Sequence, residues 1–553
     1  MTRDPASVSG PVRGPFAKEV TVTHLLDPRF ARLRSPGATL LLLLGSLGLL
    51  MLVTGEVSAA TKPGPKNPAR PAFTPPAIFD RVEEVRLENG MLFLLLPRHE
   101  VPIVSGRIRF RAGNVDCPAG RSGVAHMFEH MAFMGTDRIG AKDRPAEIAV
   151  EDSLKSVGRA LCAEVALHEE GDTARVRGLK NELDRLGQRQ YDLTNLNEFN
   201  RLYDRYSYYF NAWTSPDFTS YETDVPANAL EVWMLMESER IQNPSFRGFY
   251  RERDVVIEER RQSEDDPTDQ AWEALGATVF AAHPYRLPVL GFMSDLRTLP
   301  QEAMEEFYRT YYAPGNAVCS LVGDFDPAEA RRLIAAYFGD IPAGPSPPPV
   351  NTVEPPQQGM RRTVLRQGTE RELFLAFHGF VPTDPRYVTE TLLADVLSRD
   401  ITSRLDRRLD IKEKAATGVW ASASGDRYPG LLLVHAKPLE GFTNEQVETM
   451  AWEELAGVVS NPVTPEKLKE IQTSRRKRFY RQLVTGPALA DFLVDGQMVY
   501  GDWRRAIDVV RRTDEATADD VTALAKQMFT TDRATVILVE PEAQAASEQG
   551  GQR

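Results

Sequence analysis

The sequence predicts an α+β fold made of two duplicated units, each an antiparallel sheet packed with helices in an α/β roll. The first observation is length, because a chain of 553 residues exceeds what one hydrophobic core normally holds. The second is repetition, since the order of expected strands and helices begins again after a Pro-rich stretch at residues 342–358. The third is that both parts end alike, with an apolar strand after a turn at 312–322 and again at 529–539.

Composition and periodicity divide the chain into six segments. The expected segments are a signal peptide or N-terminal anchor at 1–60, a Pro-rich linker at 61–79, a first domain at 80–341 with a helical insertion at about 141–206, a linker at 342–358, a second domain at 359–541 and a disordered tail at 542–553. The leader is expected because arginines at 29–34 precede an apolar run at 38–53, and small residues follow it. This segment is either a signal peptide that is cleaved or a membrane anchor that is retained. Either one would direct export of the rest of the chain to the periplasm or the cell surface.

The first domain opens with two strand signals and a helix. Residues 84–97 predict a β-hairpin, because Asn89-Gly90 favours a tight turn and an apolar run follows it. Residues 104–112 alternate apolar side chains with three arginines, which predicts a strand with one buried face and one face in water. A helix is expected after the glycines at 120–123.

The insertion predicts an amphipathic helical hairpin. Apolar residues recur at helical spacing from Leu154 to Val165 and again from Val176 to Leu186, with Gly171 between the two runs. Two interpretations remain open for the hairpin: a surface decoration, or a lid or arm that binds a partner.

Periodicity predicts the remaining elements of both domains. In the first domain they are helices at 228–241, 248–263 and 304–312 and a strand at 317–322. In the second domain they are strands at 362–365 and 373–379 and helices at 389–409, 444–459 and 465–483.

The most specific chemical signal is the run His126-Met127-Phe128-Glu129-His130. Positions i, i+3 and i+4 of a helix lie on one side, so both imidazoles can bind one metal ion while Glu129 points at the same volume. A metal ion lowers the pKa of its bound water, and a nearby carboxylate can carry the proton to a leaving amine. This arrangement favours hydrolysis of a peptide bond.

A third protein ligand has to come from elsewhere, because catalytic zinc normally has three protein ligands and one open position. The acidic run at 251–259 is the best candidate, since Glu252 and Glu259 recur at helical spacing and can point to one side of a second helix. Two such carboxylates suit one metal ligand and one residue that supports a ligand.

These two motifs, together with Asn211-Ala212-Trp213-Thr214-Ser215, Thr219 and Tyr221, resemble the pitrilysin/insulinase family of zinc peptidases, which includes the mitochondrial processing peptidases and bacterial relatives. The resemblance extends from about residue 80 to 540. It implies that one Zn²⁺ is bound by His126, His130 and Glu259, that Glu129 is the general base, and that Glu252 supports the catalytic site. It also implies that Asn211, Ala212 and Thr214 contact the substrate from an edge strand.

The resemblance also implies an assembly. The family encloses its peptide substrate in a clamshell chamber of four such units, and this chain carries two, which make half of it. A homodimer, or a heterodimer with a related non-catalytic subunit, is therefore expected. The family further uses an Arg and a Tyr from a non-catalytic unit to steady the substrate carbonyl, and Arg427 and Tyr428 lie in a suitable region.

The function expected on these grounds is that of a zinc-dependent metalloendopeptidase acting on peptides or unfolded segments. The alternative is a non-catalytic or partner-dependent scaffold subunit of a two-chain peptidase. The intact set of two histidines and two glutamates favours the enzyme, because a subunit freed from catalysis has no physical need of a proton shuttle beside a metal.

Two departures from the family pattern stand out. The interval from His130 to Glu259 is longer than is usual, and the extra residues fall at about 140–206, where they must loop out for the ligands to meet. Tyr208, Tyr209 and Phe210 replace glycines that commonly precede the Asn-Ala pair. Their bulk is expected to narrow the cleft.

Composition excludes two further classes of protein. A formal charge of −12 and a pI near 5.4 argue against a nucleic-acid partner, which requires a basic face. Three cysteines, an odd number, cannot provide a disulfide framework and allow at most one bridge. The histidines outside the motif have no metal-ligand spacing to one another and are expected on the surface or in the core.

Overall fold

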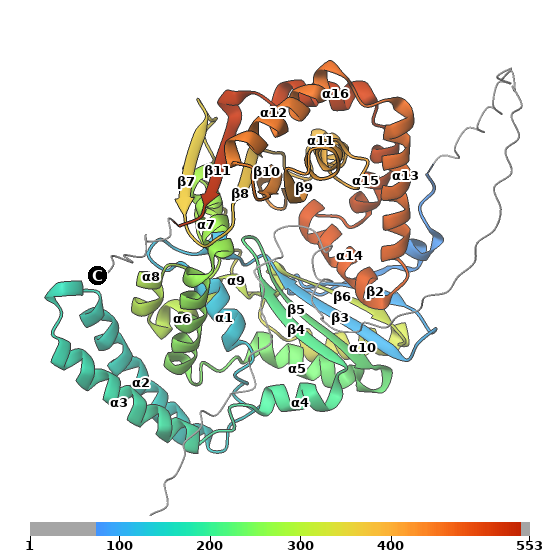
Figure 1. The fold of residues 1–553 in the computed structure, drawn as a ribbon. Helices are drawn as coiled ribbons and strands as arrows, with labels where there is room; N and C mark the ends of the chain where they lie inside the picture. Colours follow the sequence, from blue (N-terminus) through green and yellow to red (C-terminus); the bar gives the residue numbers. More distant parts are fainter. Residues whose placement is uncertain (1–72, 543–553) are drawn as a thin grey trace, which may run out of the picture. The chain divides into compact units, whose positions relative to one another are not determined.

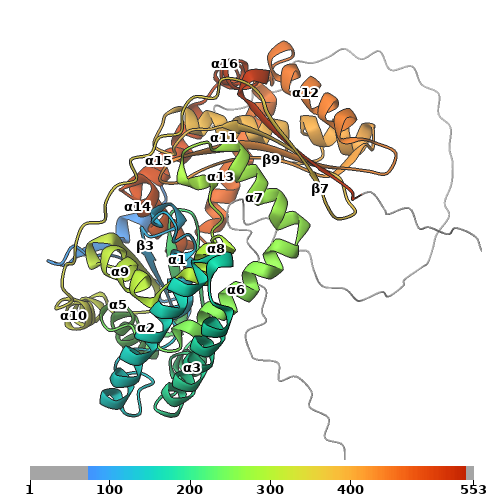
Figure 2. The same ribbon diagram turned by 90° about the vertical axis from the view of Figure 1, so that its left-hand side faces the viewer.

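The computed structural model describes residues 73–542 (Figures 1 and 2). The leader or anchor expected at 1–60, most of the linker at 61–79 and the tail beyond residue 542 lie outside the described residues. Within residues 73–542, no helix combines the length and the apolar character that crossing a bilayer requires.

The first sheet has six strands in the order β1-β2-β6-β3-β5-β4. Its strands are β1 (Glu83–Arg86), β2 (Leu92–Pro97), β3 (Ile103–Phe110), β4 (Tyr209–Thr214), β5 (Thr219–Pro226) and β6 (Ala317–Gly323). Strands β2 and β6 pair in parallel, and every other neighbouring pair is antiparallel. The predicted hairpin is confirmed as β1 and β2, with Gly90 at a φ of 92° in the turn.

Ten α-helices belong to the described part of the chain before the second sheet. They are α1 (Val124–Met131), α2 (Arg144–Val165), α3 (Thr173–Asp192), α4 (Glu198–Tyr206), α5 (Leu230–Gln242), α6 (Phe249–Asp265), α7 (Pro267–Val279), α8 (Met293–Thr298), α9 (Gln301–Tyr311) and α10 (Pro327–Phe338). A single core cluster joins the apolar faces of these helices to the sheet, with Phe93, Phe110 and Phe128 fully buried in it. The predicted helical hairpin is confirmed as α2 and α3.

The second sheet has five strands in the order β7-β11-β8-β10-β9. Its strands are β7 (Arg361–Arg366), β8 (Glu372–His378), β9 (Ala416–Gly425), β10 (Pro429–Pro438) and β11 (Ala534–Glu540). The helices of this part are α11 (Arg386–Leu397), α12 (Asn444–Ser460), α13 (Pro465–Gln482), α14 (Gly486–Tyr500), α15 (Arg504–Glu515) and α16 (Ala518–Met528). Leu375, Leu392 and Val536 lie in its own buried core.

The two sheets share one topology. If β1 is set aside, the first sheet reads β2-β6-β3-β5-β4, which is the same chain order as β7-β11-β8-β10-β9. The direction of pairing also agrees, because β7 and β11 are parallel as β2 and β6 are, and the other pairs are antiparallel. The predicted α+β fold of two duplicated units is therefore confirmed.

One predicted helix is wrong. Residues 389–409 do not form a continuous helix, because α11 ends at Leu397 and a π-helical turn begins only at Asp406. Ser398 is extended, with a φ of −152°, and the Ser403 hydroxyl accepts hydrogen bonds from the backbone N–H groups of Arg399 and Asp400. Short polar side chains that bond to nearby backbone compete with helical hydrogen bonds, which explains the break.

The prediction that one face of β3 lies in water is also wrong. Arg107 and Arg109 alternate with apolar residues as predicted, but they are only 2% and 3% exposed. Helix α14, from the second half of the chain, covers this face: Asp491 lies 2.9 Å from the Arg107 guanidinium, and Asp495 forms an ion pair with Arg109. The strand is therefore buried on both faces, with its charges matched by carboxylates that are distant in sequence.

The cysteines and the base of the insertion complete the fold. Cys117, Cys162 and Cys319 are all free, which agrees with the absence of a disulfide framework.

At the base of the α2–α3 hairpin, Arg247 donates to Glu147 (Nη2 to Oε2, 3.1 Å), and neither side chain is exposed. This buried ion pair joins α2 to the segment that leads into α6.

Replacing Glu147 with Ala is expected to destabilise the first unit by about 3–5 kcal/mol, because it leaves the Arg247 charge buried without its partner. Urea or thermal unfolding measures the effect. Glu182→Ala is the matched control, since Glu182 forms an exposed pair with Arg185 on α3, and it should leave the midpoint unchanged. Equal midpoints for the two variants would contradict the importance of the buried pair.

Glu390 predicts a pH dependence of stability. It is fully buried in α11, only one carboxyl oxygen has a partner (the N–H of Phe380, 3.0 Å), and burial raises its pKa from 4.5 to about 8. The folded chain then keeps a proton that the unfolded chain releases, so this stability contribution falls as the pH rises from 4.5 to about 8.

We therefore expect Glu390→Gln to raise the unfolding midpoint at about pH 8 and to leave it nearly unchanged at about pH 5. Thermal unfolding in the presence of a metal chelator at both pH values measures the difference. A variant that is less stable than the parent chain at the higher pH would show that Glu390 is ionised in the folded state.

Candidate metal centre

Helix α1 presents its motif because its other face is fixed in the core. Gly123 precedes the helix with a φ of 82°, and a Cβ there would lie 2.4 Å from the carbonyl oxygen of Leu290, so this position requires glycine. Phe128 is fully buried, with its ring centroid 4.2 Å from that of Tyr312 and 5.5 Å from that of Tyr308. With Phe128 held in this way, His126, Glu129 and His130 lie on the opposite side of α1.

Helix α6 brings the acidic residues to the same place. Its buried Val256 and Ile257 pack in the first core, while Glu252 and Glu259 point toward α1. The helix is further held by Arg260, which donates to Glu273 of α7 (Nη2 to Oε2, 2.9 Å). Helices α1 and α6 therefore meet although their sequences are far apart and the insertion separates them.

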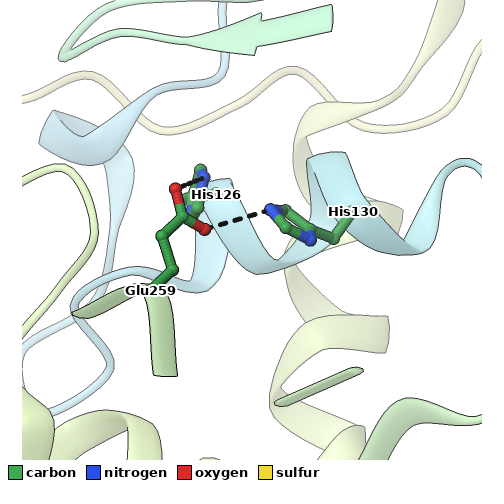
Figure 3. A group of neighbouring side chains, drawn as sticks. All are labelled: His126, His130 and Glu259. Carbon is green, nitrogen blue, oxygen red and sulfur yellow. Dashed lines mark ion pairs between the residues drawn. The ribbon is translucent and has the colours of Figure 1, made fainter. Parts of the chain in front are cut away.

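His126, His130 and Glu259 form a cluster that fits a metal ion (Figure 3). One ligand atom from each lies within 4.8 Å of the others. The Glu259 carboxylate reaches both imidazoles, with Oε1 3.9 Å from His126 Nε2 and Oε2 3.5 Å from His130 Nε2. Ligand atoms about 2.0–2.1 Å from a tetrahedral Zn²⁺ lie about 3.3–3.4 Å apart, so these separations suit coordination.

The donor set also suits zinc chemically. Two imidazoles and one carboxylate leave the fourth tetrahedral position open, which is typical of a catalytic rather than a structural zinc site. Burial lowers the pKa of His126, and its neutral form is the one that binds a metal. Its Nδ1 atom is buried and finds no hydrogen-bond partner in residues 73–542, so His126 lacks the supporting contact that His130 has.

Glu252 provides that contact for His130. Its Oε1 lies 2.8 Å from His130 Nδ1, which leaves Nε2 directed at Glu259. Burial opposes a charge on His130, but the hydrogen bonds to Glu252 and Glu259 outweigh it and raise the pKa to about 10. Burial likewise opposes the charge of Glu259, and the two histidines lower its pKa. The site is thus strongly attractive to a cation.

Glu129 is oriented by strand β4. The Thr214 hydroxyl donates to Glu129 Oε2 at 2.6 Å and lies 3.4 Å from the hydroxyl of Thr219. The resemblance implies that Thr214 contacts substrate, and in the structure its hydroxyl contacts the expected base, Glu129. The resemblance pointed to this segment, but no periodicity in the sequence indicates which partner the hydroxyl takes.

Asn211 and Ala212 lie on β4, an outer strand of the first sheet. They pair with Glu222 and Tyr221 of β5 on one side, and no other strand of residues 73–542 pairs with the opposite edge of β4. Asn211 is exposed and Ala212 is buried. The outer edge of β4 is therefore available for pairing with a further extended chain. Helix α1 packs against β4 and β5.

Arg427 and Tyr428 lie in the turn between β9 and β10, and carboxylates of the first unit engage the arginine. Arg427 Nη1 donates to Asp116 Oδ2 at 2.8 Å, and its backbone N–H donates to Asp217 at 3.4 Å. Tyr428 packs beside His283, with ring centroids 4.9 Å apart. Sequence reasoning missed Asp116 and Asp217, because only the fold brings them to this turn.

The chain has relatives among proteins named as zinc proteases. Residues 298–475 match the family model described as the Peptidase M16 inactive domain, a segment that excludes all three residues of the cluster. Zinc protease PqqE of Helicobacter pylori is 22% identical over 473 residues, which cover 83% of this chain and 93% of that protein. An uncharacterized zinc protease of Streptomyces coelicolor is 25% identical over 333 residues, covering 58% of this chain and 71% of that protein.

Solved structures share the fold. A protease from Helicobacter pylori aligns with a TM-score of 0.70 at 20% identity and covers 83% of this chain and 99% of its own. The periplasmic protease PqqL from Escherichia coli aligns with a TM-score of 0.64 at 16% identity and covers 83% of this chain but 47% of its own. At these identities the likeness establishes the fold, and this chain corresponds to about half of PqqL.

Glu252→Gln is expected to weaken zinc binding by about 10–100-fold, because it changes the group that orients His130. Competition for zinc against a chromophoric chelator measures the affinity. Glu258→Gln is the matched control: Glu258 lies on the same helix, is exposed and pairs with Arg261 at 2.8 Å. Equal zinc affinity in both variants would show that Glu252 does not support zinc binding.

Proposed function

The chain belongs to the pitrilysin family of M16 peptidases, and on that premise we propose that it is a zinc-dependent metalloendopeptidase. The observation that carries the proposal is the cluster of His126, His130 and Glu259, with Glu129 on the same helix face. The names of the relatives agree with this chemistry, since they are called zinc proteases. Peptides and unfolded segments are the proposed substrates.

In the proposed reaction each side chain has one task. His126, His130 and Glu259 hold the ion, and Glu252 keeps His130 in the orientation that presents Nε2. Zinc bound there would polarise the scissile carbonyl and make the attacking water more acidic. Glu129 removes the proton from that water and delivers it to the departing nitrogen. The Thr214 hydroxyl occupies one oxygen of Glu129, which leaves the other for proton transfer.

Strand β4 is the proposed site of substrate binding. An extended peptide can add to an outer strand through backbone hydrogen bonds, which accept many side-chain sequences. Asn211 and Ala212 offer such an edge, and Thr214 of the same strand contacts Glu129. A peptide bound along this edge would extend toward the metal centre.

Export and pairing complete the proposal. The N-terminal segment at 1–60 supports export to the periplasm or the cell surface, which cell fractionation checks. The chain matches 47% of PqqL, so a second copy or a related non-catalytic subunit would supply the other half of an enclosed chamber. The molar mass of the purified protein in solution distinguishes a single chain from such a pair.

Glu129→Gln is expected to lower peptidase activity by at least about 100-fold while zinc stays near one ion per chain, because only the proton shuttle is removed. Cleavage of a quenched peptide library and metal analysis measure the two quantities, with Glu258→Gln as the active control. Bound zinc without activity in the parent chain would favour the partner-dependent scaffold. Absence of zinc would contradict the site itself.

A further inference from the structure

A cavity of about 360 Å³ lies between the helical hairpin and the start of α6. Figure 2 shows α2, α3 and α6 side by side. Helices α2 and α3 form one wall, and residues 246–254 form the other. A volume of about 300–1,000 Å³ is typical of sites for small molecules. The cavity is separate from the metal cluster, since His126, His130 and Glu259 do not line it.

Two buried nitrogen donors that line the cavity have no partner. Gln190 and Arg253 are 2% and 5% exposed, and neither Gln190 Nε2 nor Arg253 Nε forms a hydrogen bond within the described chain. Arg253 also forms no ion pair with the residues at 73–542, because its Nη1 donates instead to the Leu299 carbonyl (3.1 Å) and to Cys162 Sγ (3.3 Å). A buried guanidinium without a carboxylate is costly unless another anion is supplied.

The first turn of α6 adds to this preference. Gly248, Phe249 and Tyr250 line the cavity, and no side chain caps the helix. Gln190 Oε1 accepts from the N–H of Gly248 at 3.0 Å, which fixes the amide so that its Nε2 is left over as a donor. The positive end of the helix dipole therefore acts on the same space as the two unpartnered donors.

Charge and apolar surface define the ligand more closely. The charged residues that line the cavity are three cations, Lys180, Arg251 and Arg253, and two carboxylates, Asp184 and Asp254. The excess of one positive charge suits a monoanion and disfavours a polyanion such as a phosphate ester. Leucines of α2 and α3, together with Phe246 and Phe249, supply apolar walls.

We propose that this cavity binds a small monocarboxylate with an apolar body, whose carboxylate meets Arg253 and Gln190. A fatty acid and an apolar amino acid or peptide end share that chemistry. The site goes beyond the proposed peptidase function and does not depend on it, because none of its groups takes part in the reaction proposed above.

Two glycines of α3 allow a matched test. A side chain added at Gly187 or at Gly178 meets nothing within 4 Å at its Cβ, but only Gly187 lines the cavity. Gly187→Leu should therefore fill the cavity without disturbing the fold, and Gly178→Leu is the control with the same change in helix propensity. Thermal shift and titration calorimetry on the full chain measure binding of octanoate, N-acetyl-leucine and octylamine.

We expect saturable binding of octanoate or N-acetyl-leucine in the parent chain and in Gly178→Leu, a loss of at least about tenfold in affinity in Gly187→Leu, and no binding of octylamine. Tighter binding of octanoate would favour a fatty acid as the ligand, and tighter binding of N-acetyl-leucine would favour an apolar amino acid or peptide end. Gln190→Glu keeps the oxygen that accepts from Gly248 but replaces the donor with a negative charge, so it should also abolish binding.

Three results would overturn the proposal. They are no saturable binding of either carboxylate, unchanged affinity in Gly187→Leu, and octylamine binding as tightly as octanoate. Peptidase activity plays no part in these readouts, so a failure of the proposed function would leave them interpretable.

Discussion

The meeting of α1 and α6 is the constraint on which the rest of the molecule depends, because neither helix alone can complete the ligand set. The imidazoles come from α1 and Glu259 comes from α6, and the ligand atoms lie within 4.8 Å of one another. Gly123 lets α1 begin against the backbone of Leu290, and Arg253 ties α6 to the carbonyl of Leu299. A large part of the first core therefore serves to immobilise two helices whose displacement by about 1 Å would impair the site.

The second unit supports this arrangement through charge. Helix α14 covers the arginine face of β3 with Asp491 and Asp495, and Arg427 reaches from the β9–β10 turn to Asp116. Arg107 and Arg109 are buried, whereas Asp491 and Asp495 are 37% and 54% exposed, so removing either aspartate would leave a buried guanidinium without that partner. The copy that lacks the His-x-x-Glu-His motif thus stabilises the sheet from which β4 presents Thr214 to Glu129.

What the sequence predicts well is what depends on local pattern. The spacing within α1, the strands of both sheets and the helical insertion follow from periodicity and turn residues over a few positions. The breaks and contacts that it misses are non-local or depend on individual side chains. The cover over Arg107 comes from a helix nearly four hundred positions away, the helix break relies on the hydroxyl of Ser403, and the partner of Thr214 is set by how two elements dock.

The outer strands differ in how well they are protected against edge-to-edge association with other chains. Strand β1 carries three charged residues out of four and β7 carries three arginines out of six, and such edges discourage pairing with a second sheet. Strand β4, with the sequence Tyr-Phe-Asn-Ala-Trp-Thr, and strand β9, at the other end of the second sheet from β7, have no charged residue. Charges on β4 would hinder the pairing with peptides that is proposed for it. The edges of β4 and β9 are therefore the places where the isolated chain is least protected against self-association, and covering the β4 edge would also reduce aggregation.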